Sequence, residues 1–166
     1  MQAWRITQQE KTWTGQGNRV LLSGPLTAFF SSRQCPGVAI RAAMDWALEQ
    51  ARSRQPVVGG FHAPLEQSVL TVLLQARCPV VAVLARPVAG ARLLPEWAEP
   101  LAQGRMAVVS VATSAGRLTE ELAAERNQWV VQLACQIVVA HASPGGRLAA
   151  LCDRWCAEGR ALTRLG

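Results

Sequence analysis

The sequence predicts a three-layer α/β domain, in which helices cover both faces of a doubly wound, mostly parallel sheet of about six strands. Short apolar segments of strand length alternate along the chain with stretches of helical periodicity. The strand segments are apolar on both faces, as parallel strands are when helices cover both sides of a sheet. A chain of 166 residues, half of them hydrophobic, is long enough for one such domain.

Residues 1–18 are predicted to be a lead-in to a single domain formed by residues 19–166. Trp4 and Ile6 alternate with polar residues like a short edge strand, whereas residues 8–17 are polar apart from Trp13. We expect the two tryptophans to pack this lead-in onto the core of the domain.

The predicted strands are short apolar runs that end at glycine, proline or polar residues. We assign them to residues 20–22, 56–60, 79–85, 106–111, 137–140 and 161–164. The predicted helices have apolar residues at helical spacing and cover residues 38–52, 64–75, 96–103, 119–134 and 147–158. Residues 26–37 are then a linker between the first strand and the first helix.

The most informative stretch is the strand 137–140 with the turn that follows it. Pro144, Gly145 and Gly146 end this stretch, and the helix that begins at Arg147 comes directly after them. Free backbone N–H groups at a helix start, with no Cβ on either glycine to block approach, suit a phosphate group. Alternatively, the glycine pair serves only to make the turn.

A ligand of such a sheet is expected beyond the carboxyl ends of its strands, near the point where the strand order reverses. Both histidines, His62 and His141, lie in loops at that edge. Cys78 and Cys135 precede their strands and therefore lie at the opposite edge, and the five cysteines form no C-x-x-C pair. We therefore predict no metal site and no cofactor, and we expect reduced cysteines in the core.

Arg126 falls on the apolar stripe of the predicted helix 119–134. A charged group on an inward face must be paired or directed at a ligand. The candidate partners in the sequence are Glu66, Glu121 and Glu125, and a ligand is the alternative.

The formal net charge of +6 is carried almost entirely by arginine, which suits phosphate contacts and permits a nucleic-acid partner. No apolar run is long enough for a membrane span, and residues 1–10 lack a signal-peptide pattern. We therefore expect a cytoplasmic protein with no membrane partner.

With these elements placed, the chain resembles the DNA-processing protein A family, also called Smf. Its Rossmann-like core is shared with the lysine-decarboxylase-like LOG proteins. The resemblance covers most of residues 19–150. It is carried by the segment ending at Gly24, Ser32-Arg33 with Gly37, Val58-Gly59-Gly60, the strand 80–84, Ser110, Arg126-Asn127 with the apolar run after them, and Ser143 with Gly145 and Gly146.

The resemblance implies a protein that binds single-stranded DNA through its phosphates and helps to load a recombinase, as a homodimer. Arg33 and Arg126 would contact phosphate, and Asn127 would orient the loop by hydrogen bonds. Neither the helical domain often found before this core nor the winged helix often found after it is expected. The residues predicted to bind phosphate or nucleic acid are Gly24, Arg33, Gly60, Ser110, Arg126, Asn127, Ser143, Gly145 and Gly146.

The alternative is a small-nucleotide sensor or a LOG-like nucleotide phosphoribohydrolase. The turn 144–146 is similar to the Pro-Gly-Gly turn of LOG proteins, but Arg147-Leu148 stand where that family continues with Gly-Thr. His62 and Glu66, four residues apart, are weak candidates for an acid and base if they share a helix face. Gln128 replaces an arginine of the DNA-processing pattern.

A third hypothesis is a structural protein without a ligand, which would use Phe29 and Phe30 as an exposed apolar patch. The same two residues and Phe61 are the candidates for stacking on nucleic-acid bases, since they fall in predicted loops.

Overall fold

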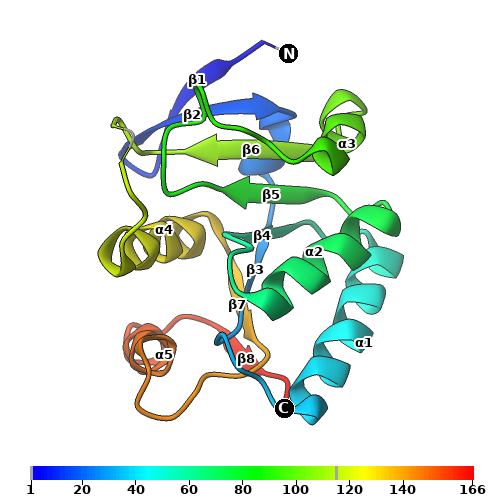
Figure 1. The fold of residues 1–166 in the computed structure, drawn as a ribbon, viewed down its shortest axis with the longest axis vertical. Helices are drawn as coiled ribbons and strands as arrows, with labels where there is room; N and C mark the ends of the chain where they lie inside the picture. Colours follow the sequence, from blue (N-terminus) through cyan, green and yellow to red (C-terminus); the bar gives the residue numbers. More distant parts are fainter. Residues whose placement is uncertain (1, 115) are drawn as a thin grey trace.

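The computed structural model describes residues 2–114 and 116–166. Over these residues the chain forms one sheet of eight strands in the order β1-β2-β6-β5-β4-β3-β7-β8 (Figure 1). The strands are β1 (Trp4–Gln8), β2 (Lys11–Gly17), β3 (Thr27–Phe30), β4 (Val57–Gly59), β5 (Val80–Val83), β6 (Met106–Ser110), β7 (Gln136–Val139) and β8 (Leu162–Arg164). The helical elements are η1 (Arg19–Ser23), α1 (Gly37–Ser53), α2 (Pro64–Gln75), η2 (Pro95–Trp97), α3 (Ala98–Ala102), α4 (Glu120–Leu133) and α5 (Arg147–Ala157).

The predicted three-layer class is confirmed. Strands β3 to β8 are all parallel to one another, whereas β1 and β2 form an antiparallel hairpin, and β2 pairs antiparallel with β6. This hairpin explains the two strands beyond the predicted six. In this hairpin polar residues alternate with apolar ones, as is usual in antiparallel strands with one face exposed to solvent. The predicted strands were assigned from uninterrupted apolar runs, which such strands lack.

The first predicted strand was wrong. Residues 19–23 form the 3-10 helix η1, because the Asn18 side chain accepts a hydrogen bond from the Val20 N–H (3.1 Å) and Val20 is exposed to solvent. The strand is β3, inside the segment expected to be a linker. Phe29 and Phe30 lie on β3 and are fully buried, so the exposed patch proposed for them does not exist.

The two faces of the sheet carry separate apolar clusters. α1, α2 and α3 cover one face, where Phe29, Val69 and Leu101 pack. α4 and α5 cover the other, where Phe30, Val130 and Trp155 pack (Figure 1). None of the helices in the described residues is long and apolar enough to cross a membrane.

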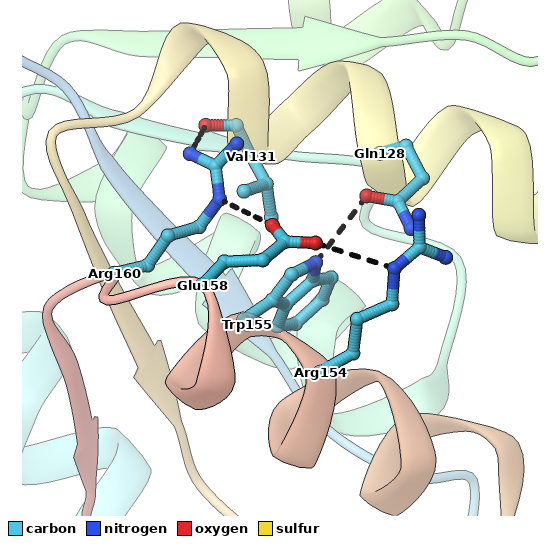
Figure 2. Close-up of polar contacts among 6 residues, drawn as sticks. All are labelled: Gln128, Val131, Arg154, Trp155, Glu158 and Arg160. Atoms are coloured by element: carbon cyan, nitrogen blue, oxygen red, sulfur yellow. Dashed lines mark hydrogen bonds and ion pairs between the residues drawn. The ribbon is translucent and has the colours of Figure 1, made fainter.

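Helix α5 is held against α4 by polar contacts at its carboxyl-terminal end (Figure 2). The buried Trp155 donates its Nε1–H to Oε1 of Gln128 on α4 (3.3 Å), and its ring packs against Phe30 with ring centroids 4.9 Å apart. Arg160 donates to the Val131 carbonyl (3.5 Å) and pairs with Glu158 (3.4 Å). Gln128 therefore joins the two helices, and these contacts hold the carboxyl-terminal end of α5 against α4.

Candidate phosphate-binding cleft

The strand order reverses between β3 and β7, which makes the loops after these two strands the expected walls of a ligand site. Two hydrogen bonds tie these loops together. The Ser32 N–H donates to the His141 carbonyl (2.8 Å), and the Ser143 N–H donates to the Ser32 hydroxyl oxygen (2.8 Å). The two loops therefore form one continuous rim.

The turn before α5 has the geometry that its sequence predicts. The Gly146 N–H donates to the Ser143 carbonyl (3.0 Å), and Gly145 has a φ of 76°, a conformation that strains any residue with a Cβ. Gly146 caps α5 without a side-chain acceptor, so the first N–H groups of the helix are not capped by a side chain. These groups and the positive end of the helix dipole favour an anion here.

Arg147 is the first residue of α5, where a cation is unfavourable unless an anion lies nearby. Its guanidinium pairs with the Glu120 carboxylate at the start of α4 (3.2 Å), and both side chains are exposed. An exposed ion pair of this kind is weak, so a bound phosphate can replace the carboxylate at little cost. The sequence analysis did not include Arg147 among the site residues, although a basic residue directly after Gly-Gly was the available signal.

Arg126 is the buried cation of the cleft, with only 6% of its surface exposed. Its Nη2 donates to the Asn127 side-chain oxygen (3.3 Å), whereas its buried Nε has no hydrogen-bond partner. No carboxylate in the described residues lies within ion-pair distance, so of the two alternatives left open by the sequence, the pairing with Glu66, Glu121 or Glu125 is not observed. Burial lowers the pKa of Arg126, and the charge of Glu66 opposes that shift.

Gly60 provides the surface on which the Arg126 side chain lies. A Cβ at position 60 would come within 2.6 Å of the guanidinium carbon and 2.8 Å of Cδ. Glycine is therefore required here by the close approach of the arginine.

The Gly60→Ala variant is expected to fold, because the conflicting atoms belong to the outer part of a flexible side chain. It is also expected to bind a phosphate ligand about 10-fold more weakly, since the guanidinium must leave its position. The affinity for oligo-dT measures the effect, and a thermal melt checks the fold. Gly37→Ala, at the exposed start of α1 where a Cβ meets no atom within 4 Å, is the matched control. Unchanged affinity in Gly60→Ala would show that the observed position of Arg126 does not matter for binding.

Glu66 organises the loops from inside the protein. Its Oε2 accepts the Ser31 N–H (3.0 Å), and its Oε1 accepts the N–H groups of His62 (3.1 Å) and Ala63 (3.4 Å). Burial raises the pKa of this carboxyl group, while these donors and Arg126 oppose the rise. The carboxylate thus joins the β3–α1 loop to the start of α2.

The structure does not support an acid–base pair of His62 and Glu66. His62 lies before α2 rather than on one of its faces, and it contacts Glu66 through its backbone N–H. The carboxylate is buried and occupied by three backbone donors. Burial, followed by the charges of Arg126 and Arg33, lowers the pKa of the His62 ring.

The cleft consists of two cavities that share His62, Leu118 and Arg126. The larger, of about 910 Å³, lies between the loops after β3 and β7 and the starts of α2, α4 and α5. The smaller, of about 330 Å³, lies beside the end of β5 and includes Arg86. Four arginines contributed by different segments line these cavities, namely Arg33, Arg86, Arg126 and Arg147.

Most of the predicted site residues meet in this cleft. Arg33, Gly60, Arg126, Asn127 and Ser143 line it, and Gly145 and Gly146 shape the adjoining turn. Asn127 differs from its expected role, because its described contact is with the Arg126 guanidinium rather than with a loop.

Two predicted residues lie elsewhere or have an internal role. Gly24 precedes β3 and therefore lies at the amino edge of the sheet, away from the cleft. Ser110 is fully buried, donates to the Leu84 carbonyl (3.0 Å) and accepts the Ala112 N–H (3.0 Å), so its hydroxyl joins the ends of β5 and β6. Phe61 is buried as well, which removes the last predicted stacking aromatic. The described residues contain no group of three or more His, Cys, Asp or Glu side chains suited to a metal ion.

Comparison with known proteins places the fold. No protein-family model and no curated protein sequence matches the chain. The solved structure of DNA processing protein A from Helicobacter pylori, described with its single-stranded DNA binding mode, matches with a TM-score of 0.78 and 13% identity, over 99% of this chain and 80% of that one. DNA processing protein A from Streptococcus pneumoniae matches with a TM-score of 0.75 and 18% identity, over 92% of this chain.

The chain spans 54% of the length of the Streptococcus pneumoniae protein. The molybdenum cofactor binding protein from Rippkaea orientalis is more distant, with a TM-score of 0.59 and 9% identity over 84% of this chain. The resemblance that the sequence indicated is thus confirmed at the level of the fold, which this chain shares with DNA processing protein A.

Proposed function

We propose that the cleft binds single-stranded DNA through its phosphate groups. The observation that carries this proposal is Arg126, a buried guanidinium with an unpartnered Nε and no carboxylate within ion-pair distance in the described residues. A buried charge of this kind is costly unless an anion completes it. The unblocked start of α5 lines the same cavity and provides a second point of attraction for phosphate.

The shape and charge of the cleft favour a chain of phosphates over a single one. Arg33, Arg126 and Arg147 lie along the larger cavity, and Arg86 lies in the smaller one. The involvement of Glu66 in backbone hydrogen bonds argues against hydrolysis of a bound nucleotide. We further infer, from the shared fold, a role in the uptake or recombination of DNA, with a homodimer in the cytoplasm and a recombinase as partner.

The test is a parallel titration with fluorescent oligo-dT and with a panel of mononucleotides, each at low and at moderate salt. Oligo-dT is expected to bind more tightly than any mononucleotide, with an affinity that falls steeply with salt because counterions are released. Binding of a mononucleotide without binding of oligo-dT would contradict the proposal and indicate a nucleotide sensor or hydrolase.

The affinity for oligo-dT is expected to rise as the pH falls below neutrality. The pKa of free His62 is lowered, and a phosphate beside the ring would raise it, so binding takes up a proton. Phosphodiesters do not titrate in this range, which makes oligo-dT the suitable probe.

Affinity measured by fluorescence anisotropy at several pH values tests this prediction. His62→Gln is expected to flatten the pH dependence, whereas His141→Gln, outside both cavities, should leave it in place. An identical pH profile in His62→Gln and in the native protein would assign the proton uptake to another group.

A further inference from the structure

A third cavity, of about 720 Å³, lies on the face of the sheet that α1, α2 and α3 cover, between α2 and the segment formed by η2 and α3. In Figure 1 these helices lie on the side of the sheet away from α4 and α5. We call this cavity the α2–α3 groove. Its volume is within the range of about 300–1,000 Å³ that is typical of small-molecule sites. None of its lining residues belongs to the phosphate-binding cleft.

One part of the α2–α3 groove is apolar. Leu70 and Leu74 come from α2, and Trp97 comes from η2. Phe61 has a left-handed φ of 49°, and its side chain lines the groove. Its neighbours Gly60 and His62 line the phosphate-binding cleft instead. At the rim, Leu94 is 54% exposed. An apolar ring or chain would therefore gain contact area here.

At the other end, two guanidinium groups converge on one neutral oxygen. The side-chain Oε1 of Gln103 accepts from Arg77 Nη2 (3.3 Å) and from both Nε (3.3 Å) and Nη2 (2.8 Å) of Arg105. The buried Nη1 of Arg105 has no partner. The Glu99 carboxylate lies 3.6 Å from Arg105, but Arg77 has no carboxylate within ion-pair distance in the described residues. Like charges held this close are unfavourable without a further anion.

We propose that the α2–α3 groove is a second ligand site, which takes a small amphipathic monoanion. The apolar body of the ligand would pack between Leu70 and Trp97, and its carboxylate or sulfonate would bind Arg77 and Arg105. Glu96 and Glu99 line the same groove, and Glu99 lies beside Arg105, so their charges disfavour a multiply charged ligand. This site is therefore distinct in its chemistry from the phosphate-binding cleft, and it does not depend on the function proposed for that cleft.

Anilinonaphthalene sulfonate, an aromatic monoanion, is the probe that tests the site in the intact, folded protein. It is expected to bind in a saturable way at one site. Arg77→Gln should weaken binding about 5-fold, which is the upper end of what one exposed ion pair contributes. Arg41→Gln removes the same charge from the exposed surface of α1, outside every cavity described above, and should have no effect. Arg77 is exposed, so its replacement leaves the fold intact.

Competition experiments separate the parts of the proposal. Octanoate and octanesulfonate should both displace the dye, and their relative strength ranks carboxylate against sulfonate, whereas the neutral octanol should not compete. The proposal is overturned if octanol competes equally well or if Arg77→Gln binds the dye like the native protein. Oligo-dT should not displace the dye, and Arg126→Gln should leave dye binding unchanged. Loss of the dye in Arg126→Gln would place it in the phosphate-binding cleft instead.

Discussion

Arg126→Gln is expected to bind oligo-dT about 30- to 100-fold more weakly than the native protein, as is typical when one member of a buried, hydrogen-bonded charge pair is lost. The guanidinium is buried and its Nε is unpartnered, so a phosphate in the cleft would meet a desolvated cation rather than a hydrated one. Electrostatic attraction is stronger in such surroundings than at the surface. Loss of one phosphate contact should also reduce the salt dependence by about one unit of slope.

Fluorescence anisotropy at several salt concentrations measures both effects, and a thermal melt verifies that the variant is folded. Arg19→Gln is the matched control. It removes one positive charge from η1, which lies before the amino end of β3 and outside the cavities described above. Equal losses in the two variants would show that only the net charge matters and that the cleft is not the binding site.

Glu66→Gln is expected to lower the free energy of unfolding by about 2 kcal/mol, a typical cost of leaving a buried donor unsatisfied. Both carboxylate oxygens accept backbone N–H groups, from Ser31 on one side and from His62 and Ala63 on the other. An amide has only one oxygen, so in either orientation its NH₂ group faces at least one N–H donor. The melting temperature should fall by about 4–8 °C for a chain of this size.

Thermal and denaturant unfolding test this prediction, with Glu121→Gln as the control. Glu121 is an exposed residue near the start of α4 with no ion pair in the described residues, so its replacement should change stability by no more than about 0.5 kcal/mol. If Glu66→Gln is as stable as the control, the backbone donors do not depend on a carboxylate, and the loops are held by other contacts.

Local sequence signals predicted the fold class and most of its elements. α2 was predicted at its observed bounds, 64–75, because a proline and an acidic residue begin an apolar helical pattern there. The strand β4, at residues 57–59, lies within the predicted strand 56–60, which a short apolar run that ends at glycine indicated. The local pattern of residues 19–30 is ambiguous. Its three consecutive apolar residues, 20–22, predict a strand, but the side chain of Asn18 caps a 3-10 helix there.

The positions of the site residues were predicted only where the sheet topology determines them. Any loop after a parallel strand reaches the carboxyl edge, which is why Arg33, Gly60 and Ser143 were predicted correctly to lie together. Gly24 was misplaced because the strand before it does not exist. Ser110 lies at the correct edge, but its hydroxyl is satisfied by Leu84 and Ala112, a fact that no local pattern could show.

The sequence by itself determined that Arg126 lies on the inward face of a helix, since periodicity depends only on spacing along the chain. It also determined the turn before α5, because a positive φ favours glycine whatever surrounds it. Only the tertiary structure decided that Glu66 is occupied by backbone donors while Arg126 lies on Gly60 and lacks a carboxylate partner. Pairing depends on distances of a few ångströms between segments far apart in the chain, and these distances arise from packing of the whole domain.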